Sequence, residues 1–179
     1  MSVTTNSVYI GTSLDGYIAD QKGGLDWLES VPNPDGNDMG YHAFLERMDA
    51  LLMGRTTYET VLSFGIEWPY TKPVYVLSNT LREVPAQLAG KVWLVRGELK
   101  DVLRGIHELG HTKLYLDGGR TIQSFLREDL VDELILTTIP VLLGGGFSLF
   151  GELAKPLAWE LVESKVYLNQ IVQRHYRRK

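Results

Sequence analysis

The chain contains no cysteine among its 179 residues, and this absence excludes several kinds of chemistry. Without thiols there is no disulfide framework, no cysteine nucleophile and no zinc site built on thiolates. Long apolar runs are also missing, because no stretch approaches the roughly 20 residues of a membrane-spanning helix. The first residues lack the basic and apolar regions of a secretory signal peptide. We therefore expect a cytoplasmic protein with no membrane partner.

Positive charge is scarce as well. The 18 lysines and arginines are outnumbered by 22 aspartates and glutamates, so the net charge is −4. A basic cluster occurs only at residues 174–179, and it is too short to form a footprint for nucleic acid. We expect no nucleic-acid partner. The length of 179 residues is typical of one domain, and we assign residues 1–179 to it.

Several nucleotide and hydrolase motifs are absent too. The chain has no Gly-x-x-x-x-Gly-Lys-Ser/Thr loop, no Gly-x-Gly-x-x-Gly fingerprint and no Gly-x-Ser-x-Gly elbow. P-loop nucleotidases, ordinary dinucleotide-binding domains and serine hydrolases of this type are therefore disfavoured. The four histidines show no metal-ligand spacing, since His107 and His111 are separated by the helix-ending Gly110. We predict no metal site.

What the chain does contain is an alternation of apolar strand patterns and amphipathic helix patterns. Strands are predicted at residues 8–14, 50–53, 74–77, 92–95, 114–117 and 133–139, and helices at 39–48, from 56 to about 64, 99–109 and from about 119 to 128. Two closing strands at 159–165 and 171–177 are predicted to be antiparallel. This order indicates an α/β fold with a mostly parallel sheet and helices on both faces.

The most informative stretch is residues 114–125, a buried strand followed by a diglycine turn and the start of a helix. Such a turn directs free backbone N–H groups at one point, which suits a phosphate. Gly118 and Gly119 let the backbone approach a ligand where a Cβ would clash. The same pattern also occurs as plain turn chemistry, so the alternative stays open at this point. Asp117, just before the turn, is either a turn former or a ligand contact.

Other strand ends carry comparable chemistry. Arg55, after the strand at 50–53, suits the ribose 2′-phosphate of NADP, although a surface arginine is an equal alternative. Residues 56–59 match a capping box, with Thr56 at the N-cap and Glu59 reaching back. Ser78 and Asn79 could bind a ribose or phosphate, or satisfy a turn. Because ligands of open α/β sheets bind beyond the carboxyl ends of the strands, these recurrences favour a phosphate-bearing ligand.

Among the carboxylates, Asp38 at the start of a predicted helix has two interpretations. Buried beside the apolar stripe of that helix, it would have a raised pKa and could protonate a nitrogen heterocycle. Alternatively, it simply caps the helix, which the sequence favours.

The chain as a whole resembles the dihydrofolate reductase superfamily, and within it the reductase domain of riboflavin biosynthesis. The resemblance rests on motifs that appear in the family's order and span nearly the whole chain: Ser-Leu-Asp-Gly-Tyr-Ile-Ala at 13–19, Leu-Met-Gly-Arg-Thr-Thr-Tyr-Glu at 52–59, Val-Leu-Ser-Asn at 76–79, Leu-Asp-Gly-Gly-Arg at 116–120 and Pro-Val-Leu-Leu-Gly-Gly-Gly at 140–146. The resemblance implies a three-layer α/β/α dihydrofolate reductase-like fold. It also implies NADPH as cofactor and a strained or cis peptide in the diglycine turn.

Carried over by position, the resemblance implies roles for particular residues. Cofactor contacts are expected from Gly11, Ile18, Gly54, Arg55, Thr56, Thr57, Ser78, Asn79, Asp117, Gly118, Gly119, Arg120, Thr121 and Ile122. Leu25 and Trp27 resemble a mobile active-site loop, His42 takes the place of an aromatic wall, and Thr137 resembles a threonine that supports the substrate-binding carboxylate. When positions are counted back from the motif at residues 53–55, Asp38 occupies the family's position for that carboxylate. The resemblance therefore makes Asp38 the catalytic candidate.

Departures from the family pattern limit what the resemblance implies about the substrate. When positions are counted forward from Trp27, Asp38 does not coincide with the family's carboxylate, because an insertion with Pro32 and Pro34 lies between them. The expected activity is NADPH-dependent hydride transfer to a pyrimidine- or pterin-like small molecule, with the aminouracil ribosyl phosphate of riboflavin biosynthesis as one candidate. Dihydrofolate reductase and a non-catalytic NADP-binding module are the alternatives. The zinc-binding deaminase half of riboflavin enzymes is excluded by the missing cysteines.

We also expect a homodimer. Apolar residues of the closing strands could bury its interface or could equally belong to the core: Trp159, Leu161, Ile171 and Val172.

Overall fold

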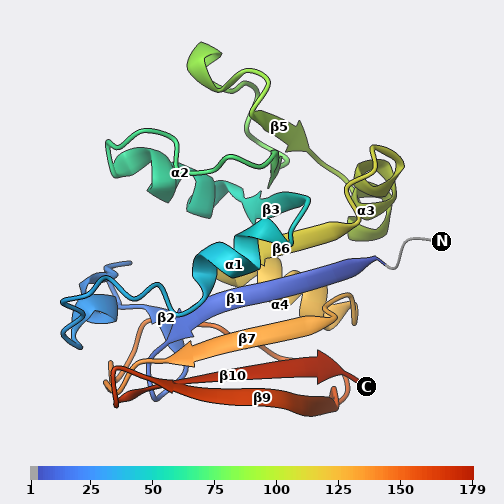
Figure 1. The fold of residues 1–179 in the computed structure, drawn as a ribbon. Coiled ribbons are helices and arrows are strands. Elements are labelled where there is room, and N and C mark those ends of the chain that lie inside the picture. The colour runs from blue at the N-terminus through green and yellow to red at the C-terminus, as the bar shows by residue number, and fades with distance from the viewer. Residues whose placement is uncertain (1–3) are drawn as a thin grey trace.

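The computed structural model describes residues 4–179 and is organised around one eight-stranded sheet (Figure 1). The strand order is β5-β4-β3-β6-β1-β7-β10-β9. The strands are β1 (Thr5–Thr12), β3 (Ala50–Gly54), β4 (Val74–Leu77), β5 (Val92–Val95), β6 (Lys113–Asp117), β7 (Glu133–Thr138), β9 (Trp159–Tyr167) and β10 (Ile171–Arg178). The first six of these in spatial order are mutually parallel, while β10 runs antiparallel to β7 and β9 antiparallel to β10. A separate two-stranded sheet pairs β2 (Tyr17–Ala19) with β8 (Phe147–Ser148).

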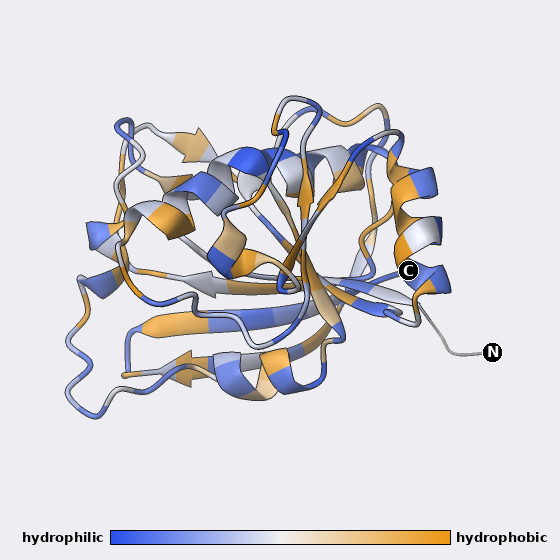
Figure 2. Cartoon of the chain, turned by 90° about the horizontal axis from the view of Figure 1, so that it is seen from above, coloured by the Kyte–Doolittle hydropathy of each residue, from blue (hydrophilic) through white to orange (hydrophobic). Residues whose placement is uncertain are grey.

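The helices cover both faces of the large sheet and so complete three layers. They are α1 (Tyr41–Glu46), α2 (Arg55–Ser63), α3 (Leu99–Glu108) and α4 (Gly119–Arg127), with two 3-10 turns, η1 (Asp26–Glu29) and η2 (Ala86–Leu88). Side chains of β3 alternate between the faces: Leu52 belongs to the core under α3 and α4, whereas Leu51 and Met53 belong to the core under α1 and α2. Figure 2 shows hydrophobic and hydrophilic residues interleaved along the same helices, as amphipathic packing requires.

The α/β architecture predicted from the sequence is confirmed, with local differences. The helix predicted at 39–48 is shorter, because Gly40 adopts a left-handed φ of 87° and the helical hydrogen-bonding begins after it. The capping box at 56–59 is wrong: α2 starts at Arg55 and has no side-chain cap. The small β2–β8 sheet was not predicted, since β8 has two residues, too few for a periodic pattern.

Two of the closing-strand residues named above belong to the core. Ile171 is 1 % exposed, and Trp159 packs on the main core, whereas Leu161 is 54 % exposed. Within residues 4–179, none of the helices is long and apolar enough to cross a membrane.

β3 and β6 are hydrogen-bonded neighbours, but the chain continues from each of them toward a different side of the sheet. After β3 the chain passes through α2 to β4 on one side, and after β6 it passes through α4 to β7 on the other side. The two helices also lie on opposite faces of the sheet, with Tyr58 of α2 in one core and Phe125 of α4 in the other. The carboxyl ends of β3 and β6 therefore form a topological switch point, the place where open α/β sheets bind ligands.

A buried carboxylate at the opposite ends of the strands supports the sheet. Glu133 accepts a hydrogen bond from the Ser7 hydroxyl (2.7 Å) and lies 3.0 Å from Arg47 Nη2 and 3.4 Å from His175 Nε2. Burial opposes its ionisation, but the hydrogen bond from Ser7 and the nearby Arg47 guanidinium outweigh this effect and lower the pKa of Glu133. The carboxylate therefore stabilises the fold above its ordinary pKa of about 4.5, and that stabilisation is lost as the pH falls through the lower folded-state value.

Glu133→Gln is expected to reduce the free energy of unfolding at pH 7 by about 1–3 kcal/mol, because Arg47 loses a charged acceptor in a half-buried site. The variant should also lose stability less steeply than the parent protein between pH 5 and pH 3. Urea unfolding at several pH values measures both effects. Glu152→Gln, at an exposed loop position, is the matched control, and equal losses in both variants would contradict the role of the Glu133 cluster.

Candidate functional site

At the switch point the first turns of α2 and α4 pack against each other through reciprocal glycine–threonine contacts. A Cβ on Gly54, at the end of β3, would lie 2.7 Å from Thr121 Oγ1 of α4. A Cβ on Gly118, at the end of β6, would overlap the Thr57 hydroxyl of α2. Neither helix has a side-chain cap, so their first backbone N–H groups stay available to a ligand. Two helix N-termini thus meet at one place, which favours an anion there.

The β2 strand and the η1 turn approach this place from the other side. A Cβ on Gly119 would lie 2.6 Å from Ile18 Cδ1 of β2. A Cβ on Gly11 of β1 would lie 2.8 Å from Leu28 Cδ2 of η1. Of the predicted pair, Ile18 is therefore next to the α4 N-terminus, and Leu28, which was not predicted, fills the space above Gly11.

Gly118 supplies the unusual backbone conformation of the turn, with φ 93° and ψ 132°. No peptide bond within residues 4–179 is cis, so the cis alternative implied by the resemblance is wrong.

Asp117 is the carboxylate that the fold directs to the switch point. It pairs with Met53 across the β6–β3 boundary and points to the same face of β6 as Tyr115, two residues earlier. One oxygen, Oδ1, accepts a hydrogen bond from the Gly118 N–H (2.8 Å). Burial raises the pKa of Asp117 to about 6, and the Gly118 hydrogen bond only partly offsets that effect. The carboxyl group is buried, while the residue as a whole is half-buried at the edge of the sheet.

Three tyrosines from separate elements surround Asp117. Burial, and then the charge of Asp117, raises the pKa of Tyr41 to about 12 and raises the pKa values of Tyr70 and Tyr115. The Tyr41 and Tyr115 rings meet edge to face with centroids 6.2 Å apart. Aromatic walls around an acid of pKa about 6 suit a flat heterocycle that receives a proton.

Arg55 lies beyond the start of α2 with partners on two elements. Its Nε donates to Glu59 Oε1 (2.6 Å) and its Nη1 donates to Thr80 Oγ1 (2.9 Å). Ser78 joins the same group, because its Oγ accepts from the Leu81 N–H (3.0 Å) and lies 3.5 Å from Thr80 Oγ1. Arg55 and Ser78 are thus connected through Thr80, which was not predicted. Glu59 pairs with Arg55 and does not cap the helix.

The family model of the RibD C-terminal domain matches residues 7–173 of the chain. The chain belongs to the RibD C-terminal domain family. This family is reductase-like. Two Bacillus subtilis (strain 168) proteins, both uncharacterized, match over most of their lengths: YwjB is 34 % identical over 94 % of this chain and 95 % of its own, and YyaP is 26 % identical over 92 % and 89 %.

Solved structures agree with this assignment. A protein from Shewanella sp. PV-4, proposed to be a riboflavin biosynthesis protein, has 54 % identity and a TM-score of 0.96 over 98 % of this chain and 99 % of its own. A deaminase/5-amino-6-(5-phosphoribosylamino)uracil reductase from Thermotoga maritima has 15 % identity and a TM-score of 0.75, with 99 % of this chain covering 57 % of that longer one. Dihydrofolate reductase from Enterococcus faecalis, solved with NADP(H), has 17 % identity and a TM-score of 0.64 over 98 % of this chain and 96 % of its own. The predicted dihydrofolate reductase-like fold is confirmed.

Several positions expected from the RibD family are located differently from the prediction. Asp38 is exposed, and its carboxylate accepts from the N–H groups of Gly40 (2.9 Å) and His42 (2.8 Å). Those hydrogen bonds lower the pKa of Asp38, so the interpretation that the sequence favoured less, a buried carboxylate with a raised pKa, is wrong. The capping alternative is the one that the structure favours, and a catalytic role for Asp38 remains only a prediction.

His42, expected in place of an aromatic wall, and Thr137, expected to support the substrate-binding carboxylate, have other partners. The His42 side chain is 81 % exposed and pairs with Glu46 at 3.5 Å, so it forms no wall of the site. The Thr137 hydroxyl accepts from Gln173 Nε2 (2.9 Å), and the same amide group donates to Met39 O (3.1 Å). This amide bridge, completed by the Tyr9 hydroxyl donating to Met39 O at 2.9 Å, occupies the place where a carboxylate was expected.

The predicted loop residues Leu25 and Trp27 are half-buried around η1. Trp27 packs with Val31, Ile139 and Ile171 in a small separate core, and its buried Nε1 has no hydrogen-bond partner. The segment is therefore held by apolar packing in this structure.

The remaining predicted cofactor residues differ in their exposure. Thr56, Asn79 and Arg120 are exposed at helix or strand ends and can reach a ligand. Ile122 is 0 % exposed in the main core and is a packing residue.

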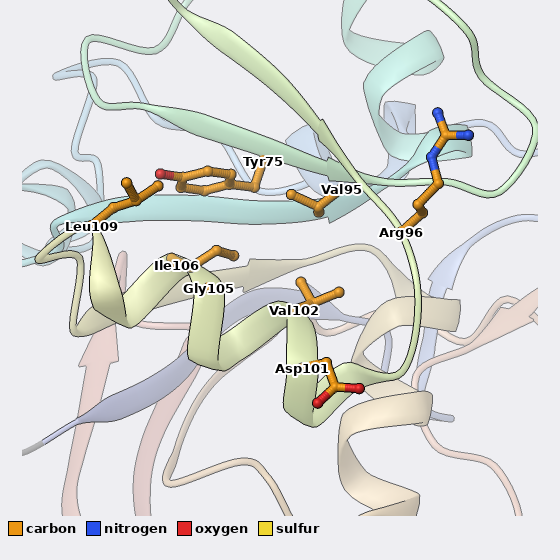
Figure 3. A pocket seen from close by; sticks show the side chains of 8 residues that line it. All are labelled: Tyr75, Val95, Arg96, Asp101, Val102, Gly105, Ile106 and Leu109. Carbon is orange, nitrogen blue, oxygen red and sulfur yellow. The ribbon is translucent and has the colours of Figure 1, made fainter.

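A pocket of about 280 Å³ lies elsewhere, between α3 and the strands β4 and β5 (Figure 3). Its lining includes Tyr75, Val102 and Leu109, and none of its 8 lining residues belongs to the switch point. The chemistry at the ends of β3 and β6 is more informative than this apolar surface hollow.

Proposed function

We propose that this RibD-family protein is an NADPH-dependent reductase that transfers hydride to a pyrimidine- or pterin-like ring. The observation that carries the proposal is the switch point between β3 and β6, where the uncapped N-termini of α2 and α4 meet beside Asp117. Membership of a reductase-like family and the NADP(H) complex of a protein with the same fold support a nicotinamide cofactor.

The residues present fit such a dinucleotide. The paired helix N-termini suit its pyrophosphate, and both N-cap residues, Gly54 and Gly118, are glycines with no side chain of their own beside the backbone N–H groups. Arg55, Thr80 and Ser78 suit the 2′-phosphate and ribose of the adenosine half. Ile18 and Gly11, on β2 and β1, would lie beside the nicotinamide. When bound, the cofactor supplies the hydride.

The protein's own part in the reaction is to orient the substrate and to provide a proton. Asp117, with a pKa of about 6, is partly protonated near neutral pH and can donate to a ring nitrogen of the substrate. Tyr41 and Tyr70 stay protonated and neutral, because burial raises their pKa values, so they act as walls and hydrogen-bond donors. Leu28 and Ile18 exclude water from the nicotinamide side.

The experiment must distinguish two candidate substrates and a non-catalytic alternative. The T. maritima protein is a 5-amino-6-(5-phosphoribosylamino)uracil reductase, which makes the aminouracil ribosyl phosphate one candidate substrate, and dihydrofolate is the other. Steady-state oxidation of NADPH with each compound, and with a panel of pterins and pyrimidines, separates them. Tight NADPH binding without turnover of any compound would instead indicate a non-catalytic NADP-binding module.

Arg55→Ala is expected to weaken NADPH binding about 10- to 100-fold and to leave NADH binding unchanged, because a charge-assisted contact with the 2′-phosphate is worth about 1.5–3 kcal/mol. Glu59→Gln should act in the opposite direction, since it removes the carboxylate that competes for Arg55 Nε. Fluorescence titration with both cofactors measures the two effects. Arg104→Ala, an exposed arginine of α3 that pairs with Asp101, is the control. Parallel losses of NADPH and NADH affinity in Arg55→Ala would contradict the 2′-phosphate assignment.

A further inference from the structure

Groups of opposite charge are separated along the carboxyl ends of the strands. On the side of β4, two guanidinium groups meet the turn that follows this strand. Arg55 Nη1 donates to Thr80 Oγ1 at 2.9 Å, and Arg96 Nη2 donates to Leu81 O at 3.4 Å. On the side of β6, the charged group at the strand end is the carboxyl of Asp117. The switch point thus has cations on one side and an acid on the other.

No cation accompanies the Asp117 carboxyl. Among residues 4–179, only burial and the Gly118 N–H shift the pKa of this group, so no lysine, arginine or histidine is close enough to affect it. The phenols around it are alike in this respect. Apart from burial, only Asp117 and other tyrosines influence the pKa values of Tyr41 and Tyr70. The acid is therefore surrounded by neutral aromatic rings.

The basic side chains that could approach this group have other positions and partners. The Arg47 guanidinium lies 3.0 Å from a Glu133 carboxylate oxygen on β7, which is two places from β6 in the sheet. Lys72 donates to Glu46 O at the far end of α1. Arg120 belongs to α4, on the opposite face of the sheet from α1. A phosphate placed beside Asp117 would find no partner among these three cations.

A second carboxylate adds negative charge near the start of α1. Asp38 is exposed there and accepts from the His42 N–H. Burial raises the pKa of Tyr9, and the charge of Asp38 adds to that effect. The His42 imidazole is paired with Glu46 at 3.5 Å. Because like charges repel, this side of the site disfavours an anionic substrate.

The anion-suited groups of the switch point are those that the cofactor would use. In the proposed function, the N-termini of α2 and α4 take the pyrophosphate and Arg55 takes the 2′-phosphate, so the substrate meets the Asp117 side. A phosphate there, with about −1.5 to −2 charges, would be repelled by the carboxylate. A ring that gains a proton would instead be attracted by the carboxylate and by the faces of the phenols.

We propose that the substrate of this reductase is an N-heterocycle without a phosphate group, neutral in solution and cationic once it is protonated at the site. This inference rests on the proposed function. In that reaction, the proton of Asp117 passes to the nitrogen of a C=N bond, and the adjacent carbon accepts the hydride that NADPH supplies, leaving NADP⁺. The π electrons of the C=N bond become the nitrogen lone pair, and the Asp117 carboxylate regains a proton from water.

Pairs of compounds that differ only in a phosphate test this charge selection. The aminouracil riboside and dihydroneopterin, each with and without a phosphate on the side chain, are titrated by calorimetry in the presence and absence of NADP⁺. The unphosphorylated member of at least one pair should bind at least about tenfold more tightly, because the phosphate meets the charge of Asp117.

Variants that change the charge of the site should change the preference. Asp117→Asn should reduce it to about threefold or less, because the amide is neutral and can still accept from the Gly118 N–H. Tyr70→Lys, which adds a cation near Asp117, should favour the phosphorylated members. Tyr70→Gln removes the ring without adding charge and should not move the ratio toward them. Asp101→Asn, at an exposed position of α3, is the matched control for the aspartate.

NADPH oxidation is measured separately with the same compounds, so that the two proposals can fail independently. Equal or faster turnover of the phosphorylated members would keep the reductase function and overturn the charge selection. The expected binding preference without any NADPH oxidation would keep the charge selection and overturn the reductase function. The charge selection would also be overturned if no unphosphorylated member binds, or if the preference is the same in the parent protein, Asp117→Asn and Tyr70→Lys.

Discussion

Gly118→Ala is expected to lower the free energy of unfolding by about 3 kcal/mol or more and to abolish detectable NADPH binding. Two costs add up at this position. The φ of 93° strains any residue that has a Cβ, and the new Cβ would overlap the Thr57 hydroxyl, with Thr57 Cβ 3.3 Å away. Relief of the overlap requires α2 and α4 to move apart, which separates the helix N-termini that the proposed pyrophosphate site needs. Thermal unfolding and fluorescence titration with NADPH measure the two effects.

Two further variants separate these costs. Gly97→Ala, at a φ of 117° with no atom within 4 Å of the added Cβ, should lose only the strain energy of about 1 kcal/mol. Thr57→Ala combined with Gly118→Ala should recover part of the stability, because the overlapping hydroxyl is gone while the strain remains. Equal losses in Gly97→Ala and Gly118→Ala would mean that the interlocked helix ends add nothing.

Asp117→Asn is expected to reduce the turnover number about 10²- to 10⁴-fold with the substrate that NADPH reduces, because an amide cannot supply a proton. In the parent protein, the rate of a step that needs protonated Asp117 falls as the pH rises through about 6. The variant should lose that pH dependence, while its affinity for NADPH changes little. Stopped-flow measurement of NADPH oxidation across pH 5 to 8 provides the comparison.

Asp38→Asn is the matched control, since Asp38 is an exposed helix cap with a lowered pKa. It should keep the pH profile of the parent protein. Carboxyl-carbon NMR titration gives a readout that does not depend on a substrate: one aspartate resonance should titrate near pH 6 and disappear in Asp117→Asn. If Asp38→Asn loses activity and Asp117→Asn does not, the proton donor is Asp38, as the family resemblance first implied.

The fold and the phosphate-suited strand ends could be predicted because they depend on local sequence. Strand and helix periodicity located β4 and β5 with the same bounds as the structure has, and the glycines at 54, 118 and 119 marked strand ends where side chains do not fit. The parallel order then implied that these ends share one edge of the sheet. The contact of Gly118 with Thr57, across two elements 61 residues apart, is consistent with that expectation.

The acid–base chemistry could not be predicted in the same way. The raised pKa of Asp117 depends on burial among Tyr41, Tyr70 and Tyr115, which come from three separate segments. Only the proximity of Asp117 to Tyr115 could be inferred from the sequence, because residues two apart on a strand share a face. Gln173 was out of reach for a related reason: its amide contacts Thr137 and Met39 only through the antiparallel pairing of β10 with β7.

The capping-box motif was misleading, because a nearby side chain competed with the helix N-terminus for Glu59. Glu59 matched a capping box, yet Arg55, four residues earlier on the exposed side of α2, takes its carboxylate. Ion pairs at this spacing form on helix surfaces without any role in the cap. The aspartate before a helix was not misleading in this way, because the sequence favoured the capping task for Asp38 and its carboxylate accepts hydrogen bonds from the start of α1.

The reciprocal contacts of Gly54 with Thr121 and of Gly118 with Thr57 have a thermodynamic consequence for binding. They hold the first turns of α2 and α4 against each other in the free protein, so binding of an anion there would cost little conformational entropy. The Arg55 side chain differs, because it must leave or share Glu59 to meet a phosphate. If NADPH binds as proposed, affinity at its pyrophosphate end would rest on preorganisation, and discrimination at its adenosine end would depend on a side chain that has to rearrange.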